Sequence, residues 1–126
     1  MERRENTYQI HLFPNTPPHD PRMRIEDDAL TLLVKKCADF GALKVGVVSL
    51  SGTIRATRNG QALQTKVDYS PGAPYPEGGP NVTSYIGGRQ EHLFGELEHM
   101  SPLHAVQPGE SISMTQQNVL LELPLQ

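Results

Sequence analysis

The first part of the chain alternates between apolar and polar side chains in the way that a half-buried strand requires. In residues 7–13 the apolar residues Tyr8, Ile10 and Leu12 alternate with the polar residues Thr7, Gln9 and His11, and Pro14 follows. This period of two predicts a strand with one buried face, because successive side chains of a strand point to opposite faces of a sheet. Proline lacks a ladder donor and marks the end of the strand.

The next regular pattern has the period of an α-helix. Three acidic residues at positions 26–28 stand where a helix N-terminus favours negative charge, and Gly41 stands where a helix commonly stops. The apolar positions between them follow the spacing i, i+3, i+4, i+7, i+8, and they are Leu30, Leu33, Val34, Cys37 and Ala38. This spacing predicts a helix over residues 27–40 with one face packed on the core.

A nearly all-apolar run at residues 43–50, with β-branched residues at Val45, Val47 and Val48, predicts a strand buried on both faces, at the centre of a sheet. The dipeptide Asn59-Gly60 then separates two alternating runs, which is a strong hairpin signal. A two-residue turn pairs Arg58 with Gln61, Ala56 with Leu63 and Ile54 with Thr65. The other face then carries Thr53, Arg55, Thr57, Gln64 and Lys66.

The rest of the chain predicts short elements. Residues 82–86 have the pattern of a strand, and residues 89–100 are assigned to a short helix, although the internal Gly95 disfavours one. The end of the chain has the pattern of a meander: strands at residues 104–107, 111–115 and 119–123, with a Pro108-Gly109 turn after the first of them.

Together these patterns predict a single α+β domain over residues 1–126. A mostly antiparallel sheet is covered on one face by the helix at 27–40, and a second short helix lies near 89–100. The hydrophobic fraction of 37% contains no tryptophan and few other aromatic residues, so the core is expected to be mainly aliphatic. A small aliphatic core beneath a polar, exposed sheet favours a homo-oligomer.

Charge is distributed unevenly along the chain. Residues 1–89 hold all 11 lysines and arginines and nine acids, whereas residues 90–126 hold five acids and no base. Nucleic-acid binding is not expected, because it rests on clustered cations and the C-terminal third would repel a phosphate backbone. The asymmetry fits either self-assembly through unlike faces or a solvated surface.

The single cysteine cannot form an internal disulfide, which fits a reducing compartment, and we expect a cytoplasmic protein. The sequence contains neither the apolar run of a signal peptide nor one long enough to cross a membrane, so no membrane partner is expected.

The stretch at residues 69–81 is the most unusual part of the sequence, because four prolines and three glycines stand in 13 positions. Irregular connections of this length in a small domain are commonly functional. Tyrosines with nearby cations form a plausible cradle for an anionic planar ligand or a partner peptide. The predicted ligand-binding residues are Arg55, Lys66, Tyr69, Tyr75, Tyr85 and Arg89.

Other chemistry has weaker support. On the predicted helix at 89–100, His92, Glu96 and His99 would be spaced to converge on a metal ion, but a solvated polar face explains the same pattern. No catalytic residue and no cofactor are assigned. Cys37 falls on the apolar helix face, and the sequence contains no nucleophile elbow, P-loop or dinucleotide-binding fingerprint.

The segment FGALKVGVVSLSGTIRATR, at residues 40–58, and the closing segment SMTQQNVLLELPL loosely resemble the plant and prokaryote conserved domain. That resemblance covers about half of the chain and implies a trimeric α+β fold linked to DNA association. The His-x-His and Gly-Gly-His elements of that family have no counterpart in this sequence. Neither its metal ligands nor its function are therefore carried over.

Three functional hypotheses follow from the sequence. The first is a small non-enzymatic binding protein that sequesters or senses a small anionic ligand, or grips a protein partner, through residues 69–89. The second is a metal-assisted hydrolase or isomerase that uses His92, Glu96 and His99. The third is a structural subunit of an assembly.

Overall fold

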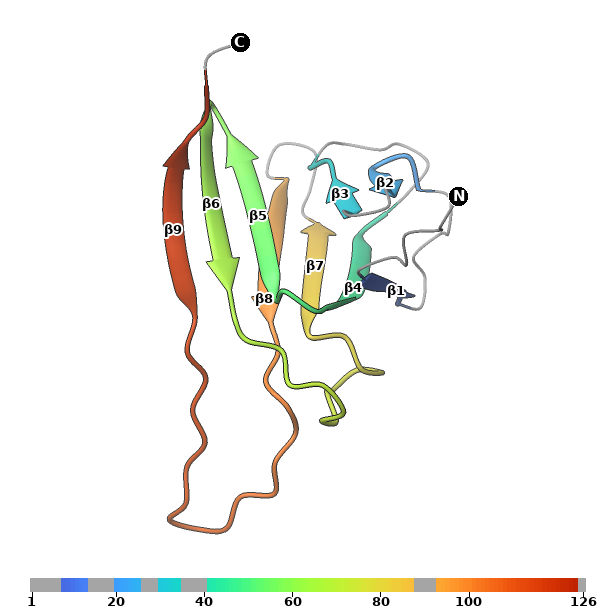
Figure 1. Cartoon of the computed structure of the whole chain (residues 1–126). Helices are drawn as coiled ribbons and strands as arrows, with labels where there is room; N and C mark the ends of the chain where they lie inside the picture. The colour runs from blue at the N-terminus through green and yellow to red at the C-terminus, as the bar shows by residue number, and fades with distance from the viewer. Residues whose placement is uncertain (1–7, 14–19, 26–29, 35–40, 88–92, 125–126) are drawn as a thin grey trace, which may run out of the picture.

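The computed structural model describes residues 8–13, 20–25, 30–34, 41–87 and 93–124, and these form three antiparallel sheets without a helix (Figure 1). The α+β prediction is therefore wrong in the described part of the chain. The strands are β1 (Tyr8–Leu12), β2 (Met23–Ile25), β3 (Leu30–Leu32), β4 (Leu43–Ser49), β5 (Thr53–Arg58), β6 (Gln61–Lys66), β7 (Val82–Gly87), β8 (Phe94–His99) and β9 (Gln117–Glu122).

The main sheet has the strand order β1-β4-β7-β8. The predicted strands at 7–13, 43–50 and 82–86 correspond to β1, β4 and β7, and β4 lies inside the sheet as predicted. A small ribbon of β2 and β3 packs on one face of this sheet. The buried core residues are Leu43, Val45 and Ile86, and the apolar residues packed against them are Ile10, Met23, Leu30 and Leu32.

A buried ion pair anchors the start of the ribbon. The Arg22 guanidinium donates from Nε to Asp20 Oδ1 at 2.9 Å and from Nη2 to Asp20 Oδ2 at 2.6 Å. It also donates to the carbonyl of Gly41, at 2.7 Å, just before β4. The hydrogen bonds from Arg22 lower the pKa of the Asp20 carboxyl below its usual value. Sequence reasoning did not single out this pair.

The helix predicted at 27–40 is contradicted by β3. Leu30 and Leu32 pack on the core while Thr31 between them is exposed, which is the period of a strand. Leu33 and Val34, which a helix would bury, are 44% and 53% exposed. The run LTLLV satisfies both periods, and pairing with β2 decides between them. Residues 26–29 and 35–40 lie outside the described part, and with them Cys37 and Ala38.

The short helix predicted at 89–100 is also wrong where the chain is described, because Phe94–His99 forms strand β8. Its partner is β7, with Tyr85 opposite Glu96 and Val82 opposite His99. Gly95 disfavours a helix, whereas pairing with β7 satisfies the backbone of this segment.

The outer sheet, formed by β5, β6 and β9 in that order, stands beside the main sheet (Figure 1). Its hairpin confirms the predicted register, with Arg58 opposite Gln61 and Ile54 opposite Thr65. Both turn residues have positive φ, 50° at Asn59 and 75° at Gly60. This is the signature of a type I′ turn, whose twist matches that of paired strands.

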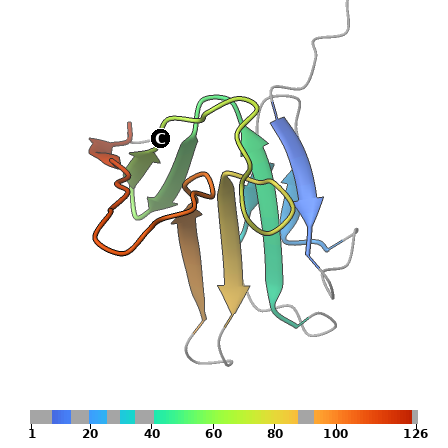
Figure 2. The same cartoon turned by 90° about the horizontal axis from the view of Figure 1, so that it is seen from below.

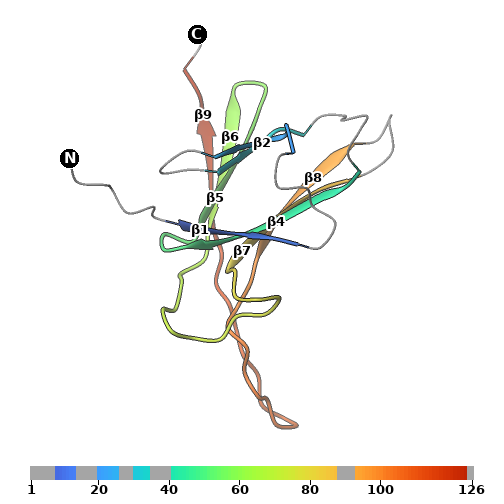
Figure 3. The ribbon, with the colours of Figure 1, turned by 90° about the vertical axis from the view of Figure 1, so that its right-hand side faces the viewer.

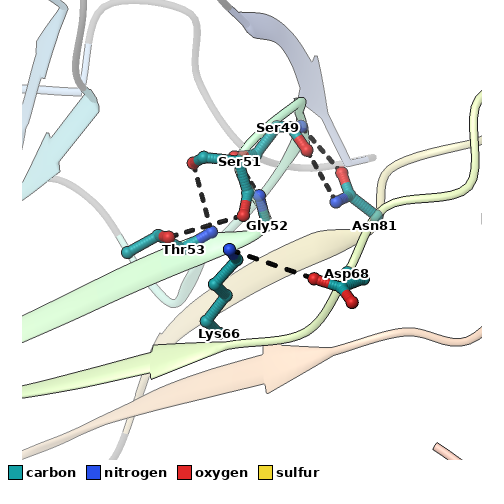
Figure 4. A network of polar contacts seen from close by, with 7 residues as sticks. All are labelled: Ser49, Ser51, Gly52, Thr53, Lys66, Asp68 and Asn81. Atoms are coloured by element: carbon teal, nitrogen blue, oxygen red, sulfur yellow. Dashed lines mark hydrogen bonds and ion pairs between the residues drawn. The ribbon is translucent and has the colours of Figure 1, made fainter. Parts of the chain in front are cut away.

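The junction between the two sheets is held by polar contacts around Ser49 and Gly52 (Figure 4). The side chain of Asn81 forms two hydrogen bonds with the backbone of Ser49. Its Oδ1 accepts from Ser49 N at 2.7 Å, and its Nδ2 donates to Ser49 O at 2.9 Å. Gly52 has a φ of 66°, and a Cβ there would lie 1.9 Å from the carbonyl oxygen of Val67. Glycine is therefore required at this crossing point.

Between β8 and β9 the chain leaves the body as a long projection, residues 100–116, which we call the arm (Figures 1 and 3). The predicted turn at its tip is confirmed: Glu110 N donates to Gln107 O at 3.0 Å, and Gly109 has a φ of 89°. The strands predicted on either side of this turn, at 104–107 and 111–115, are not formed.

Candidate interaction surface

The Pro/Gly-rich loop is packed largely against its own chain. Tyr75 is only 7% exposed, and its hydroxyl oxygen accepts a hydrogen bond from Ser70 N at 2.9 Å. The rings of Tyr69 and Tyr75 stack with their centroids 5.4 Å apart. Pro80 is fully buried, and a Cβ added to Gly46 of β4 would clash with its ring. These contacts leave little of the Tyr75 side chain exposed for contact with a ligand.

The two predicted cations that the structure describes, Arg55 and Lys66, lie on the outer sheet. Arg55 and Lys66 share one face of it, as predicted; Arg55 donates to the side-chain oxygen of Gln64 at 3.0 Å, and Lys66 lies 3.9 Å from the carboxylate of Asp68. Both side chains point into solvent.

Tyr85 lies on β7 of the main sheet, with its ring centroid 5.9 Å from that of Phe94. The contacts of the predicted site residues therefore fall in separate places: the loop, the outer sheet and the main sheet. Arg89 lies outside the described residues.

The predicted metal-binding set is not brought together. Glu96 and His99 are three positions apart on strand β8, so their side chains point to opposite faces of the sheet. His92 lies outside the described residues. The carboxyl of Glu96 instead interacts with that of Glu98, which raises its pKa.

His99 joins the two large sheets. Its Nε2 and the hydroxyl of Thr65 on β6 share a hydrogen bond of 2.7 Å. Partial burial lowers the pKa of the imidazole, because the charged form loses hydration there. Thr65 itself is buried, so this contact marks the place where the outer sheet rests on the body.

A continuous stretch of exposed residues begins in the chain after this contact, and sequence reasoning did not assign it. Every residue from 103 to 120 is exposed, across the arm and most of β9. Six large apolar side chains lie in this stretch: Leu103, Val106, Ile112, Met114, Val119 and Leu120. An exposed apolar surface on a small protein commonly marks an interaction site.

The outer sheet extends this surface. Leu63 and Leu120 are directly paired on one face, and they are 40% and 68% exposed. Val119 is exposed on the opposite face of the same strand. A small sheet is stable in water when a hydrophobic face is packed against another element, and within the described residues neither face is fully covered.

The free edge of β9 carries less charge than the edges at β5 and β8, whereas the edge at β1 carries no Asp, Glu, Lys or Arg. Strands β5 and β8 each carry two charged residues, Arg55 and Arg58 or Glu96 and Glu98, which discourage pairing with another chain. Strand β9 carries one, Glu122, at its last position. Among the described residues it pairs only with β6, and Figures 1 and 2 show it on the outside of the molecule.

The arm has the character of a protein contact. Its charged residue is Glu110 at the turn, and its other side chains are apolar, hydroxyl, amide or imidazole groups. Depletion of charge with retained apolar groups is typical of interface cores. One signal was available in the sequence, since residues 111–115 alternate strictly between Ser or Thr and apolar residues.

No protein-family model, curated protein or solved structure matches this chain. The resemblance to the plant and prokaryote conserved domain therefore has no support from these comparisons, and its α+β fold differs from the three sheets described above. Within the described residues, no helix is long and apolar enough to cross a membrane.

Proposed function

We propose that this protein is a non-enzymatic structural subunit that assembles with copies of itself. The observation that carries the proposal is the exposed surface of residues 103–120, with its six large apolar side chains. An arm of this kind buries little against its own chain. Its role is best explained by contacts with another subunit.

The root of the arm supports this reading, because it is fixed to the body. Met100 N donates to Asn81 O at 2.9 Å, and Leu103 N donates to Pro74 O at 2.7 Å. The Pro/Gly-rich loop therefore holds the start of the arm through these two hydrogen bonds. In this proposal the loop is a platform that sets the direction of the arm.

The geometry favours assembly over the other two hypotheses. A metal-assisted enzyme would need His92, Glu96 and His99 on one helix, whereas Glu96 and His99 lie on strand β8. Ligand binding by the loop residues stays a prediction, but Tyr75 is engaged in internal contacts. Assembly uses the side chains that are actually presented to solvent.

Two equally exposed leucines provide a matched test. Leu120 on β9 is 68% exposed, and Leu50 in the connection between β4 and β5 is 66% exposed. We expect the wild-type chain to form an oligomer in native mass spectrometry and light scattering. Leu120→Lys should weaken that association at least about tenfold, the equivalent of about 1.4 kcal/mol, because a lysine would be desolvated in the contact.

Leu50→Lys should leave the association unchanged. Both variants should unfold in urea within about 0.5 kcal/mol of each other as monomers, because both positions are on the surface. A wild-type chain that stays monomeric at high concentration would contradict the proposed function. Equal weakening of the association by both variants would mean that the contact between subunits does not involve β9 specifically.

A further inference from the structure

The second leg of the arm, residues 111–116, has the sequence of a strand and no strand partner among the residues that the structure describes. Among the described residues, the backbone amides of the arm that donate hydrogen bonds are those of Met100, Leu103, Gln107 and Glu110. The amides and carbonyls of the second leg are left to solvent or to another molecule. Unpaired extended backbone is the usual donor in strand addition.

We propose that residues 111–116 of one copy add as a strand to the free edge of β9 in a second copy, and that the second copy does the same in return. This inference rests on the proposed self-assembly and specifies its contact. Residues 111–122 of the two copies would then run antiparallel about a two-fold axis near Gln116 or Gln117. Two-fold contacts of this reciprocal kind are the commonest in homo-oligomers.

The lengths agree with this pairing. The second leg has six residues, and β9 is also six residues long. In Figure 1 the arm runs away from the turn of β5 and β6, so the arm of the same chain points away from its own β9. An antiparallel second copy brings its arm back along that edge.

The side-chain pattern agrees as well. If the alternation of β9 continues into the leg, Ile112 and Met114 fall on the same face as Leu120. An axis at Gln116 places Ile112 opposite Leu120 of the second copy, and an axis at Gln117 places Met114 there. Leu63 lies beside Leu120 on that face and extends the apolar row.

The charges favour a second copy as the occupant of the edge. Residues 111–122 contain one charged group, Glu122. Antiparallel pairing keeps the two copies of Glu122 at opposite ends of the joined strands, roughly 40 Å apart at 3.3 Å per residue. A nucleic acid would find no cation anywhere in residues 90–126.

Disulfide trapping between single-cysteine variants tests the pairing directly. In a Cys37→Ser background, Leu120→Cys protein would be mixed with Ile112→Cys protein or with Met114→Cys protein, and then oxidised. Directly opposed residues of paired strands have Cα atoms about 4.5–5.5 Å apart, within the range of a disulfide. We expect a covalent heterodimer in at least one mixture on a non-reducing gel.

A mixture of Leu120→Cys with Leu50→Cys is the matched control and should stay uncrosslinked. If native mass spectrometry shows an oligomer but neither arm position crosslinks above this control, strand addition is wrong while self-assembly stands. If the protein is monomeric, both fail together. Amide hydrogen exchange gives a second readout, since residues 111–116 should be protected in the oligomer and not in monomeric Leu120→Lys.

Discussion

Two segments of the chain reverse direction at a two-residue turn: the hairpin of β5 and β6, and the arm. The hairpin forms a full ladder of paired strands, whereas the arm does not. The first turn is Asn59-Gly60, and its flanking strands pair over six residues on each side. The second is Pro108-Gly109, and no strand follows or precedes it within residues 100–116. Both are closed by residues that favour turns.

The difference lies in the first residue of each turn. Asn59 adopts a φ of 50°, which asparagine tolerates and which a type I′ turn requires. Proline is fixed near −65°, so Pro108 followed by Gly109 at 89° gives a type II turn. Turns of type II splay the strands that they join, whereas type I′ turns match their twist. Turn chemistry therefore decides whether a hairpin pairs with itself or presents its legs to a partner.

The largest effect is expected from opening the closed hairpin with Asn59→Pro. The positive φ at this position is forbidden to proline, so the turn and the pairing of β5 with β6 should be lost. The free energy of unfolding in urea should fall by more than about 1 kcal/mol. Asn59→Asp is the control, because Asp-Gly also supports a type I′ turn and should stay near the wild type. Equal stability of Asn59→Pro and Asn59→Asp would mean that the turn does not set the ladder.

The converse change is Pro108→Asn, which creates an Asn-Gly turn at the tip of the arm. We expect the two legs to pair, with amide exchange at residues 103–106 and 111–114 slowed roughly fivefold, the equivalent of about 1 kcal/mol. The measurement should be made in the monomeric Leu120→Lys background, so that assembly does not contribute. Pro108→Ala removes the proline without favouring positive φ, and it should leave exchange fast. Identical exchange in the two variants would show that something other than the turn keeps the legs apart.

The smallest effect is expected at the hydrogen bond between His99 and Thr65, which joins the hairpin of β5 and β6 to the main sheet. The pKa of His99 is lowered by burial in the folded state, so the unfolded chain binds more protons below the ordinary pKa of about 6.5. Stability should therefore be greatest above that pH and decline as the pH falls from about 6.5 towards the lower folded pKa. Urea unfolding at several pH values measures this slope.

In that experiment His99→Gln should flatten the slope, because an amide can replace the hydrogen bond to Thr65 without titrating. His104→Gln is the control at an exposed position of the arm. A slope that persists in His99→Gln would assign the titration to another group.

Several strands could be predicted from the sequence, because they depend on residues that are close together in the chain. The alternation at β1, the apolar run at β4 and the Asn59-Gly60 register were predicted correctly, since side-chain period and turn type are local properties. The two helix predictions failed where local patterns were ambiguous. LTLLV fits two periods, and Phe94–His99 is a strand because β7 offers it a partner.

The prediction of the binding site also depended on contacts between residues that are distant in sequence. Sequence identified the Pro/Gly-rich loop as unusual, but burial of Tyr75 and the internal stacking of Tyr69 depend on contacts between distant residues. The five predicted site residues that the structure describes lie on the loop, on the outer sheet and on the main sheet. Exposure is a property of the folded chain, so the surface of residues 103–120 became visible only there.

By itself the sequence determined the central strand, the closed hairpin and the turn at the tip of the arm, because each follows from φ preferences and side-chain period within a few residues. Only the tertiary structure decided that β3 and β8 are strands and that Asp20 and Arg22 are buried together. These outcomes depend on which distant backbone groups and apolar surfaces come within reach. Local preference cannot specify that, since the same segment pairs or stays open according to its neighbours.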